Sequence, residues 1–177
     1  MGWITGSFGR IRTVSFVLFA VFALAGCRLT VSLTGGNVDP RAKTVYIQTF
    51  RNNATLVNPT LSNEFTSALK DRIQGQTPLT IIDTQNGDYK LEGEISGYSI
   101  NPVAIQGDET AAMNRLTITV NVRFTNNADH TQDFEKSFSA SQSYETTQSL
   151  QSVQEELVTQ MVKDLCDQIF NATVANW

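Results

Sequence analysis

Two cysteines are the most reactive side chains in this sequence of 177 residues, and they stand in very different surroundings. Cys27 follows an apolar run and the small residues Ala25 and Gly26. Small residues let an extended backbone enter a peptidase cleft, and a cysteine sulfur can be alkylated to a thioether. Cys166 stands in a helical apolar pattern near the end of the chain, where we interpret it as a small core hydrophobe rather than a reactive or pairing thiol.

His130 is the single histidine of the sequence, and it falls in a predicted turn. Without a second histidine or a cysteine cluster, the residues for a zinc-type site are missing, and no glycine-rich phosphate loop is present. Glu92 and Glu94 share one face of a predicted strand, which is typical of a solvated surface. We therefore predict no catalytic residues, no metal site and no enzymatic activity.

The segment before Cys27 has the pattern of a secretory signal. Two arginines precede an uncharged apolar run at residues 14–24, which is shorter than the roughly 20 residues of a membrane-spanning helix. The motif Leu24-Ala25-Gly26-Cys27 resembles the lipobox of bacterial lipoproteins. The alternative is an ordinary secreted protein with a chance cysteine. We predict that residues 1–26 are removed and that Cys27 carries a diacylglycerol and an N-acyl chain, because two or more acyl chains anchor a protein stably.

Removal of the leader would leave 151 residues with 11 basic and 17 acidic side chains. This length suits one domain, predicted at residues 43–177, after a tether at residues 27–42. A net acidic domain is a poor candidate for nucleic-acid binding. Residues 28–34 contain no acidic side chain, which favours an anchor in the outer membrane, on the periplasmic side.

Hydrophobic periodicity predicts seven elements. Strands are expected at 43–50, 79–82, 89–98, 116–125 and 134–140, and helices from Asn58-Pro59 to Gly75 and from 150 to 174. The strand at 116–125 alternates apolar and polar residues throughout, as a strand with one buried face does. Ser152 and Glu155 could form a capping box for the last helix.

The order of these elements is β-α-β-β-β-β-α. A helix between the first two strands predicts their parallel pairing, and hairpins predict antiparallel pairing of the rest. We therefore predict an α/β (α+β) two-layer sandwich, with two helices packed on one face of a mostly antiparallel sheet. Lys136 lies among inward-facing apolar residues of the strand at 134–140. It is interpreted as a charge that protects an edge strand, with a ligand contact as the alternative.

Several stretches of the chain are similar to the LptE family of lipopolysaccharide-assembly lipoproteins, in its short form. They are Val45-Tyr46-Ile47-Gln48-Thr49-Phe50, Leu56-Val57-Asn58-Pro59-Thr60-Leu61-Ser62, Leu91-Glu92-Gly93-Glu94-Ile95-Ser96-Gly97-Tyr98, Asn114-Arg115-Leu116-Thr117-Ile118-Thr119-Val120-Asn121-Val122-Arg123-Phe124-Thr125-Asn126 and Ala175-Asn176-Trp177. The resemblance implies a two-helix, four-stranded domain. It also implies a role inside or beside a large outer-membrane β-barrel, LptD, which the domain would plug and help to assemble while lipopolysaccharide passes to the outer leaflet.

The family resemblance transfers no binding residue to this chain other than the acylated Cys27. Arg115, Arg123 and Lys136 are candidates for contact with anionic lipopolysaccharide headgroups, and the segment Asn101–Asn114 is a candidate partner-binding loop. The alternative function is a lipoprotein that activates a periplasmic cell-wall synthase. A tether of about a dozen residues reaches at most ~45 Å, at ~3.5 Å per residue, which favours action close to the membrane.

Overall fold

The computed structural model describes residues 38–56, 58–103 and 112–174. The predicted leader, Cys27 and the first part of the tether lie outside the described residues. The described elements are β1 (Thr44–Ile47), β2 (Arg51–Asn52), α2 (Leu61–Gln76), β3 (Thr80–Ile82), β4 (Tyr89–Val103), β5 (Met113–Asn126), the 3₁₀ helix η1 (His130–Gln132), β6 (Phe134–Glu145) and α3 (Leu150–Thr173).

The strands form one mixed sheet in the order β3-β1-β4-β5-β6, and β2 also pairs with β4. β1 runs parallel to both β3 and β4, which confirms the predicted parallel pairing around the first helix. The three long strands β4, β5 and β6 are antiparallel neighbours. The extent of these two ladders makes the sheet mostly antiparallel, as predicted.

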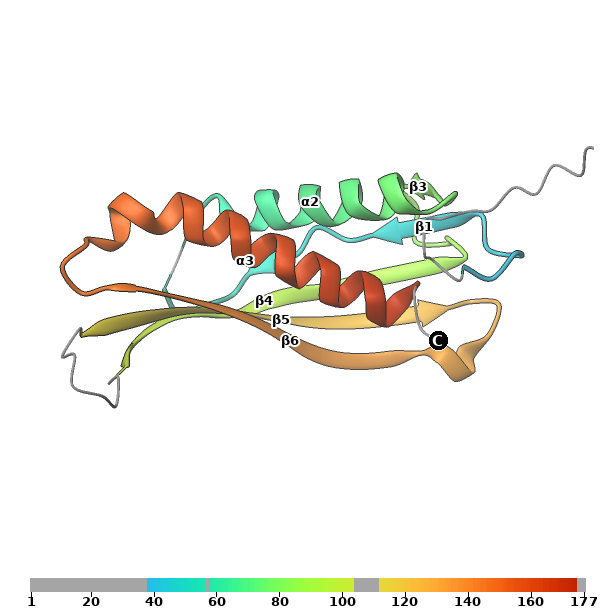
Figure 1. The fold of residues 1–177 in the computed structure, drawn as a ribbon. Helices are drawn as coiled ribbons and strands as arrows, with labels where there is room; N and C mark the ends of the chain where they lie inside the picture. Colours follow the sequence, from blue (N-terminus) through green and yellow to red (C-terminus); the bar gives the residue numbers. More distant parts are fainter. Residues whose placement is uncertain (1–37, 57, 104–111, 175–177) are drawn as a thin grey trace, which may run out of the picture. The chain divides into compact units, whose positions relative to one another are not determined.

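Both helices pack on the same face of the sheet, so the fold is the predicted two-layer α+β sandwich (Figure 1). The apolar half of β5 forms the centre of the core, and its side chains are at most 1% exposed: Leu116, Ile118, Val120, Val122 and Phe124. Phe50 meets Phe65 of α2 edge to face, with ring centroids 5.1 Å apart. Burial of this single face accounts for the strict alternation in the sequence of β5.

The first predicted strand, 43–50, is interrupted rather than continuous. Phe50 is fully buried, and side chains of α2 take the place of a neighbouring strand around it. The Thr66 hydroxyl accepts a hydrogen bond from the Phe50 N–H at 3.1 Å, and the Ser62 hydroxyl donates to the Phe50 carbonyl at 2.7 Å. These side-chain partners satisfy the backbone where the ladder is lost, so β1 ends at Ile47 and β2 begins at Arg51.

β4 is longer than predicted, because its pairing with β5 continues past a β-bulge. The pair Ile95–Val120 is followed directly by Gly97–Thr119, which leaves Ser96 as an extra residue. The bulge shifts the alternation by one position, so that Tyr98 points into the core with 4% exposure. Strand pairing then continues to Val103, and the ends of the predicted loop 101–114 belong to β4 and β5. Residues 104–111 of that loop lie outside the described residues.

The helix boundaries differ from the predicted ones in their capping. α2 begins at Leu61, after the Asn58 side chain has accepted hydrogen bonds from the N–H and the hydroxyl of Thr60 at 3.1 and 2.9 Å. α3 begins at Leu150, so the proposed Ser152–Glu155 capping box is wrong. Ser152 lies inside the first turn, and its hydroxyl donates to the Ser149 carbonyl at 2.7 Å.

Candidate functional site

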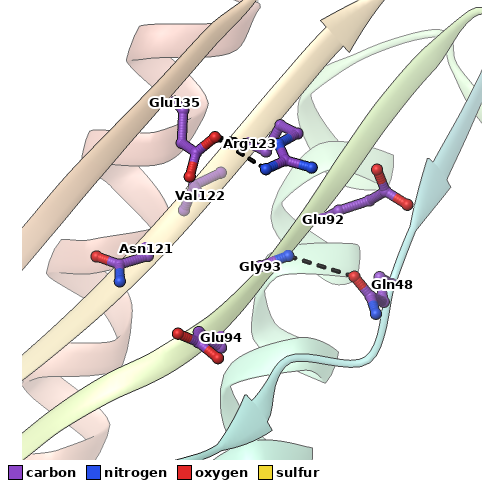
Figure 2. A pocket seen from close by; sticks show the side chains of 8 residues that line it. All are labelled: Gln48, Glu92, Gly93, Glu94, Asn121, Val122, Arg123 and Glu135. Atoms are coloured by element: carbon purple, nitrogen blue, oxygen red, sulfur yellow. Dashed lines mark hydrogen bonds and ion pairs between the residues drawn. The ribbon is translucent and has the colours of Figure 1, made fainter.

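A shallow hollow of about 370 Å³ lies on the sheet face opposite the helices. Its polar lining comes from the end of β1 and from β4, β5 and β6: Gln48, Glu92, Glu94, Asn121, Arg123 and Glu135. Figure 2 shows Arg123 and Glu135 pointing toward one another, and Gln48 reaching toward the backbone of β4. The Gly93 N–H donates to the Gln48 side-chain oxygen at 3.4 Å.

Each charged side chain of this hollow has a polar or charged neighbour, and one pair lies within the hollow itself. The Arg123 guanidinium donates to a single oxygen of Glu135 from Nε at 3.1 Å and from Nη2 at 3.0 Å. Glu94 accepts a 2.6 Å hydrogen bond from the Asn53 amide. Glu92 lies 3.7 Å from the Lys90 ammonium at the rim. With one guanidinium among three carboxylates, the hollow does not favour an anionic ligand.

Gly93 allows the close strand packing beneath this hollow. A Cβ on Gly93 would lie 2.0 Å from the Asn121 carbonyl oxygen and 2.8 Å from the ring of Phe50. The first of these contacts is with backbone, so a side chain here would force β4 and β5 apart. Strand packing, rather than space for a ligand, therefore explains why residue 93 is a glycine.

The three predicted headgroup contacts do not form one cluster. Arg115 and Arg123 lie on the same face of β5, but they are eight residues apart, or about 26 Å at ~3.3 Å per residue. Lys136 belongs to the helix-facing row of β6, and its ammonium lies 4.9 Å from the centre of the Phe134 ring. β6 is the outer strand of the described sheet, which is the position that the edge-protection interpretation of Lys136 requires.

A ladder of polar side chains, all small except one arginine, extends from the hollow along the same face of β5 and β6. Its four cross-strand rows are Asn121–Ser137, Thr119–Ser139, Thr117–Ser141 and Arg115–Ser143. We call these eight residues the hydroxyl ladder. Residues of the ladder on β6 are all exposed. Sequence reasoning missed this feature, although serine at every second position of 137–143 is a visible period-two signal.

On the helical side, Cys166 is buried with 3% exposure, consistent with its interpretation as a core residue. Burial, with a smaller contribution from Asp167, raises the pKa of the Cys166 thiol to about 12. A groove of about 400 Å³ between α2 and α3 passes over this residue. Arg72 stands at the groove, where it contacts Asp167 at 2.9 Å and lies 5.1 Å from the centre of the Phe170 ring.

His130 is exposed in η1, with its Nδ1 2.9 Å from a carboxylate oxygen of Asp133. Among residues 38–56, 58–103 and 112–174, no group of three or more histidine, cysteine, aspartate or glutamate side chains is arranged to hold a metal ion. A search of the same ranges for a helix with the length and hydropathy of a membrane span found none.

A family model described as LptE: Lipopolysaccharide-assembly matches residues 42–173. The match begins just before β1 and ends at the last residue of α3. It therefore spans the complete sheet and both helices. A comparison with curated proteins gives no match.

Solved structures with the same fold include a putative neuraminyllactose-binding hemagglutinin homologue from Helicobacter pylori, with a TM-score of 0.52 at 11% identity over 77% of this chain and 88% of that one. A hypothetical protein from Chlamydia trachomatis has a TM-score of 0.51 at 11% identity, over 76% and 99% of the two chains. The rare lipoprotein B from Shewanella oneidensis matches with a TM-score of 0.47 and 14% identity, over 72% and 92%.

Proposed function

This chain belongs to the LptE family of lipopolysaccharide-assembly proteins, and from that premise we propose that it is a non-enzymatic outer-membrane lipoprotein. In this proposal it plugs an LptD-like β-barrel, assists the assembly of that barrel and helps to deliver lipopolysaccharide to the outer leaflet. The observation that carries the proposal is the extent of the family match. It covers every described strand and helix, so the family's assembly role applies to the whole folded domain rather than to a fragment.

The surface chemistry of the domain supports a place inside a wide barrel. The interior of such a barrel is polar, so a domain within it needs hydrogen-bonding groups rather than an apolar patch. Leu56 is the one large hydrophobic side chain that is exposed, at 44%, within the described residues. The face of the sheet opposite the helices presents the hydroxyl ladder and the Arg123–Glu135 ion pair.

Attachment to the membrane is proposed to come from Cys27. The isolated Leu56 offers the described domain little area for insertion into lipid, at ~25 cal/mol per Å² of buried apolar surface. Two or more acyl chains on the Cys27 sulfur and the new amino terminus would supply a stable anchor. The outer membrane, on its periplasmic side, is the location that fits both the family and the lack of acidic residues at 28–34.

Among the proposed lipopolysaccharide contacts, Arg115 is the strongest candidate. Arg115 is exposed at the far end of the hydroxyl ladder, opposite Asn101 and Ser143, and its cross-strand neighbours carry no charge. Arg123 is held by Glu135, and Lys136 faces the other side of the sheet. The three basic side chains therefore cannot bind one headgroup together. We expect any contact with an anion to depend mainly on Arg115.

Gentle detergent extraction of the full chain with a C-terminal tag tests the proposal. We expect a large heat-modifiable barrel to co-purify in near-equal amount, and mass spectrometry to find a triacylated Cys27 at the amino terminus. A matched Cys27→Ser variant should carry no acyl chains. Recovery of a cell-wall synthase in place of the barrel would support the alternative function and contradict this one.

A further inference from the structure

The segment that precedes the described domain has the sequence pattern of a β-strand. Residues 29–34 read Leu-Thr-Val-Ser-Leu-Thr, so that apolar and polar side chains alternate without exception. Strict alternation is typical of a strand with one buried face. Gly35 and Gly36 follow, and glycine permits a sharp change of chain direction before the described residues start at Val38.

The outer side of β6 is an open edge that such a strand could join. Among the described residues, β6 pairs with β5 on one side and with no strand on the other. The Gln168 side chain of α3 donates to the Ser139 carbonyl at 3.2 Å, from which we infer that this carbonyl points away from β5. Alternate residues of an antiparallel strand direct their backbone groups to the same side, so the N–H groups of Glu135 and Ser137 also point to the open edge.

The two faces of β6 match the two faces of the segment 29–34. On the helix-facing side of β6, Phe134 and Phe138 pack against the core but are only partly buried. The apolar row of the segment could cover the exposed parts of both rings, which would favour pairing. The opposite side of β6 presents the exposed Ser137 and Ser139, and the threonines and serine of the segment would extend this polar face.

The alternative edge and the charge on β6 do not exclude this pairing. β3, the other outer strand of the described sheet, is only three residues long, Thr80–Ile82. Lys136 lies between the two phenylalanines of β6, and an inward charge of this kind disfavours pairing by a foreign strand. A strand of the same chain is held at a high effective concentration, so it can pair beside this lysine.

The length of the connection permits the segment to reach β6. The Asp39 N–H donates to the Tyr89 hydroxyl at 3.1 Å. From the Tyr89 ring, two ring-to-ring steps of 5.3 and 5.5 Å lead through Phe124 to Phe134, the first residue of β6. The four peptide steps between residues 34 and 38 span up to ~14 Å at ~3.5 Å per residue. Residue 34 can therefore lie beside Phe134, and the segment would then run antiparallel to β6.

We propose that residues 29–34 add to the open edge of β6 as an antiparallel strand, with Leu29, Val31 and Leu33 on the helix-facing side. Most of the tether is then part of the folded domain. The pairing itself does not depend on acylation. Its consequence for the membrane rests on the proposed function, because the acyl chains of Cys27 would then leave the domain beside β6 rather than at the end of an extended tether.

Hydrogen exchange in the full chain, purified in detergent and free of any partner, tests the pairing at single residues. We expect the N–H groups of Glu135 and Ser137 to exchange slowly, because the added strand accepts their hydrogen bonds. Leu33→Asn removes an apolar contact without adding charge, and it should speed exchange at both positions by about tenfold or more. Thr34→Asn, on the polar face, is the matched control and should leave both rates unchanged.

Two further measurements keep the test independent of the stability of the Leu33→Asn variant. The Lys136 N–H, which faces β5, should stay slow in both variants and so report that the sheet is intact. A photo-crosslinking residue at Val31 in the parent chain should capture β6 of the same chain.

Several results would overturn the added strand. They are fast exchange of Glu135 and Ser137 in the parent, slow exchange that Leu33→Asn leaves unchanged, and crosslinks from Val31 to β3 or to a second chain. Co-purification of the barrel is measured separately. A negative exchange result with the barrel still recovered would therefore remove this inference alone, and loss of the barrel with the exchange pattern intact would remove only the proposed function.

Discussion

The guanidinium of Arg123 and the carboxylate of Glu135 form a cross-strand pair on the face of the sheet opposite the helices, with two N–H groups donating to one oxygen at 3.0 and 3.1 Å. Both side chains are more than half exposed, so the pair contributes little to stability. Its main effect is on charge, because Arg123 is not available as an isolated cation. Arg115, with uncharged cross-strand neighbours, is different.

This difference predicts unequal effects on lipopolysaccharide binding. Arg115→Glu is expected to weaken binding by the purified domain by ~2- to 5-fold, the range typical of one exposed ionic contact. Arg123→Glu and Lys136→Glu should each change binding less than Arg115→Glu does. Titration with purified lipopolysaccharide at fixed salt measures all three. Equal losses at Arg115 and Arg123 would show that the Glu135 pairing does not withhold Arg123 from the ligand. Unchanged binding in all three variants would exclude these residues as headgroup contacts.

Substitution of two glycines by alanine should change the free energy of unfolding in opposite directions. Gly93→Ala should destabilise the domain by about 1–3 kcal/mol or more, because the new Cβ would lie 2.0 Å from the Asn121 carbonyl oxygen. Gly75→Ala should stabilise it by up to about 1 kcal/mol, because Gly75 lies in α2 with open space around it. Urea midpoints measure both. A Gly93→Ala midpoint equal to that of the parent would show that β4 and β5 adjust without cost.

The hydrogen bonds of Asp88 predict that the folded domain loses part of its stability at low pH. One carboxylate oxygen accepts the Lys43 N–H at 2.8 Å, the Thr44 N–H at 2.9 Å and the Thr44 hydroxyl at 2.8 Å. These bonds, the Lys43 N–H first among them, lower the pKa of Asp88 below its usual value of 3.8. The stabilisation is therefore present above about pH 4 and is lost as the pH falls through the lowered pKa in the folded state.

The expected result is that Asp88→Asn removes part of this pH dependence. Stability of the parent, measured by urea unfolding from pH 6 down to about pH 2, should fall more steeply below pH 4 than that of the variant. The two curves should differ most at neutral pH, where the parent is more stable. Parallel curves across the whole range would show that Asp88 does not link the start of β1 to β4 in this way.

The thiol of Cys166 should resist alkylation in the folded protein. A pKa of about 12 leaves a thiolate fraction at pH 8 that is roughly a thousandfold below that of a thiol at 9.0. In a Cys27→Ser background Cys166 is the single thiol, so iodoacetamide labelling reports on it alone. We expect slow labelling that becomes fast in urea. Rapid labelling without denaturant would contradict a buried core role.

The parts of the fold that were predicted correctly depend on burial of one face. The alternation of Leu116 to Phe124 defines which side of β5 faces the core, and the helical stripes define two covering helices. The features that were missed depend on particular contacts. Thr66 and Ser62 of α2 form hydrogen bonds with the backbone of Phe50 in the sheet layer. The sequence around residues 48–50 contains no pattern that predicts these bonds.

The candidate site was less predictable than the fold. The sequence identifies basic residues by their charge, but pairing across strands decides whether that charge is available, and the partner of Arg123 is twelve residues away. The bulge at Ser96 also reverses the faces of β4 beyond that point, so side-chain direction could not be extrapolated along the strand. The serine alternation at 137–143 was visible, but it gains meaning only when aligned with Thr117 and Thr119 of β5.

Depletion of this chain from the cell that produces it tests the proposed function most directly. We expect lipopolysaccharide at the cell surface to fall as the folded, heat-modifiable form of the partner barrel disappears, while cell-wall synthesis continues at its usual rate. Restoring the chain with an intact Cys27 should restore both. Unchanged surface lipopolysaccharide, together with a loss of cell-wall synthase activity, would contradict a role in lipopolysaccharide delivery.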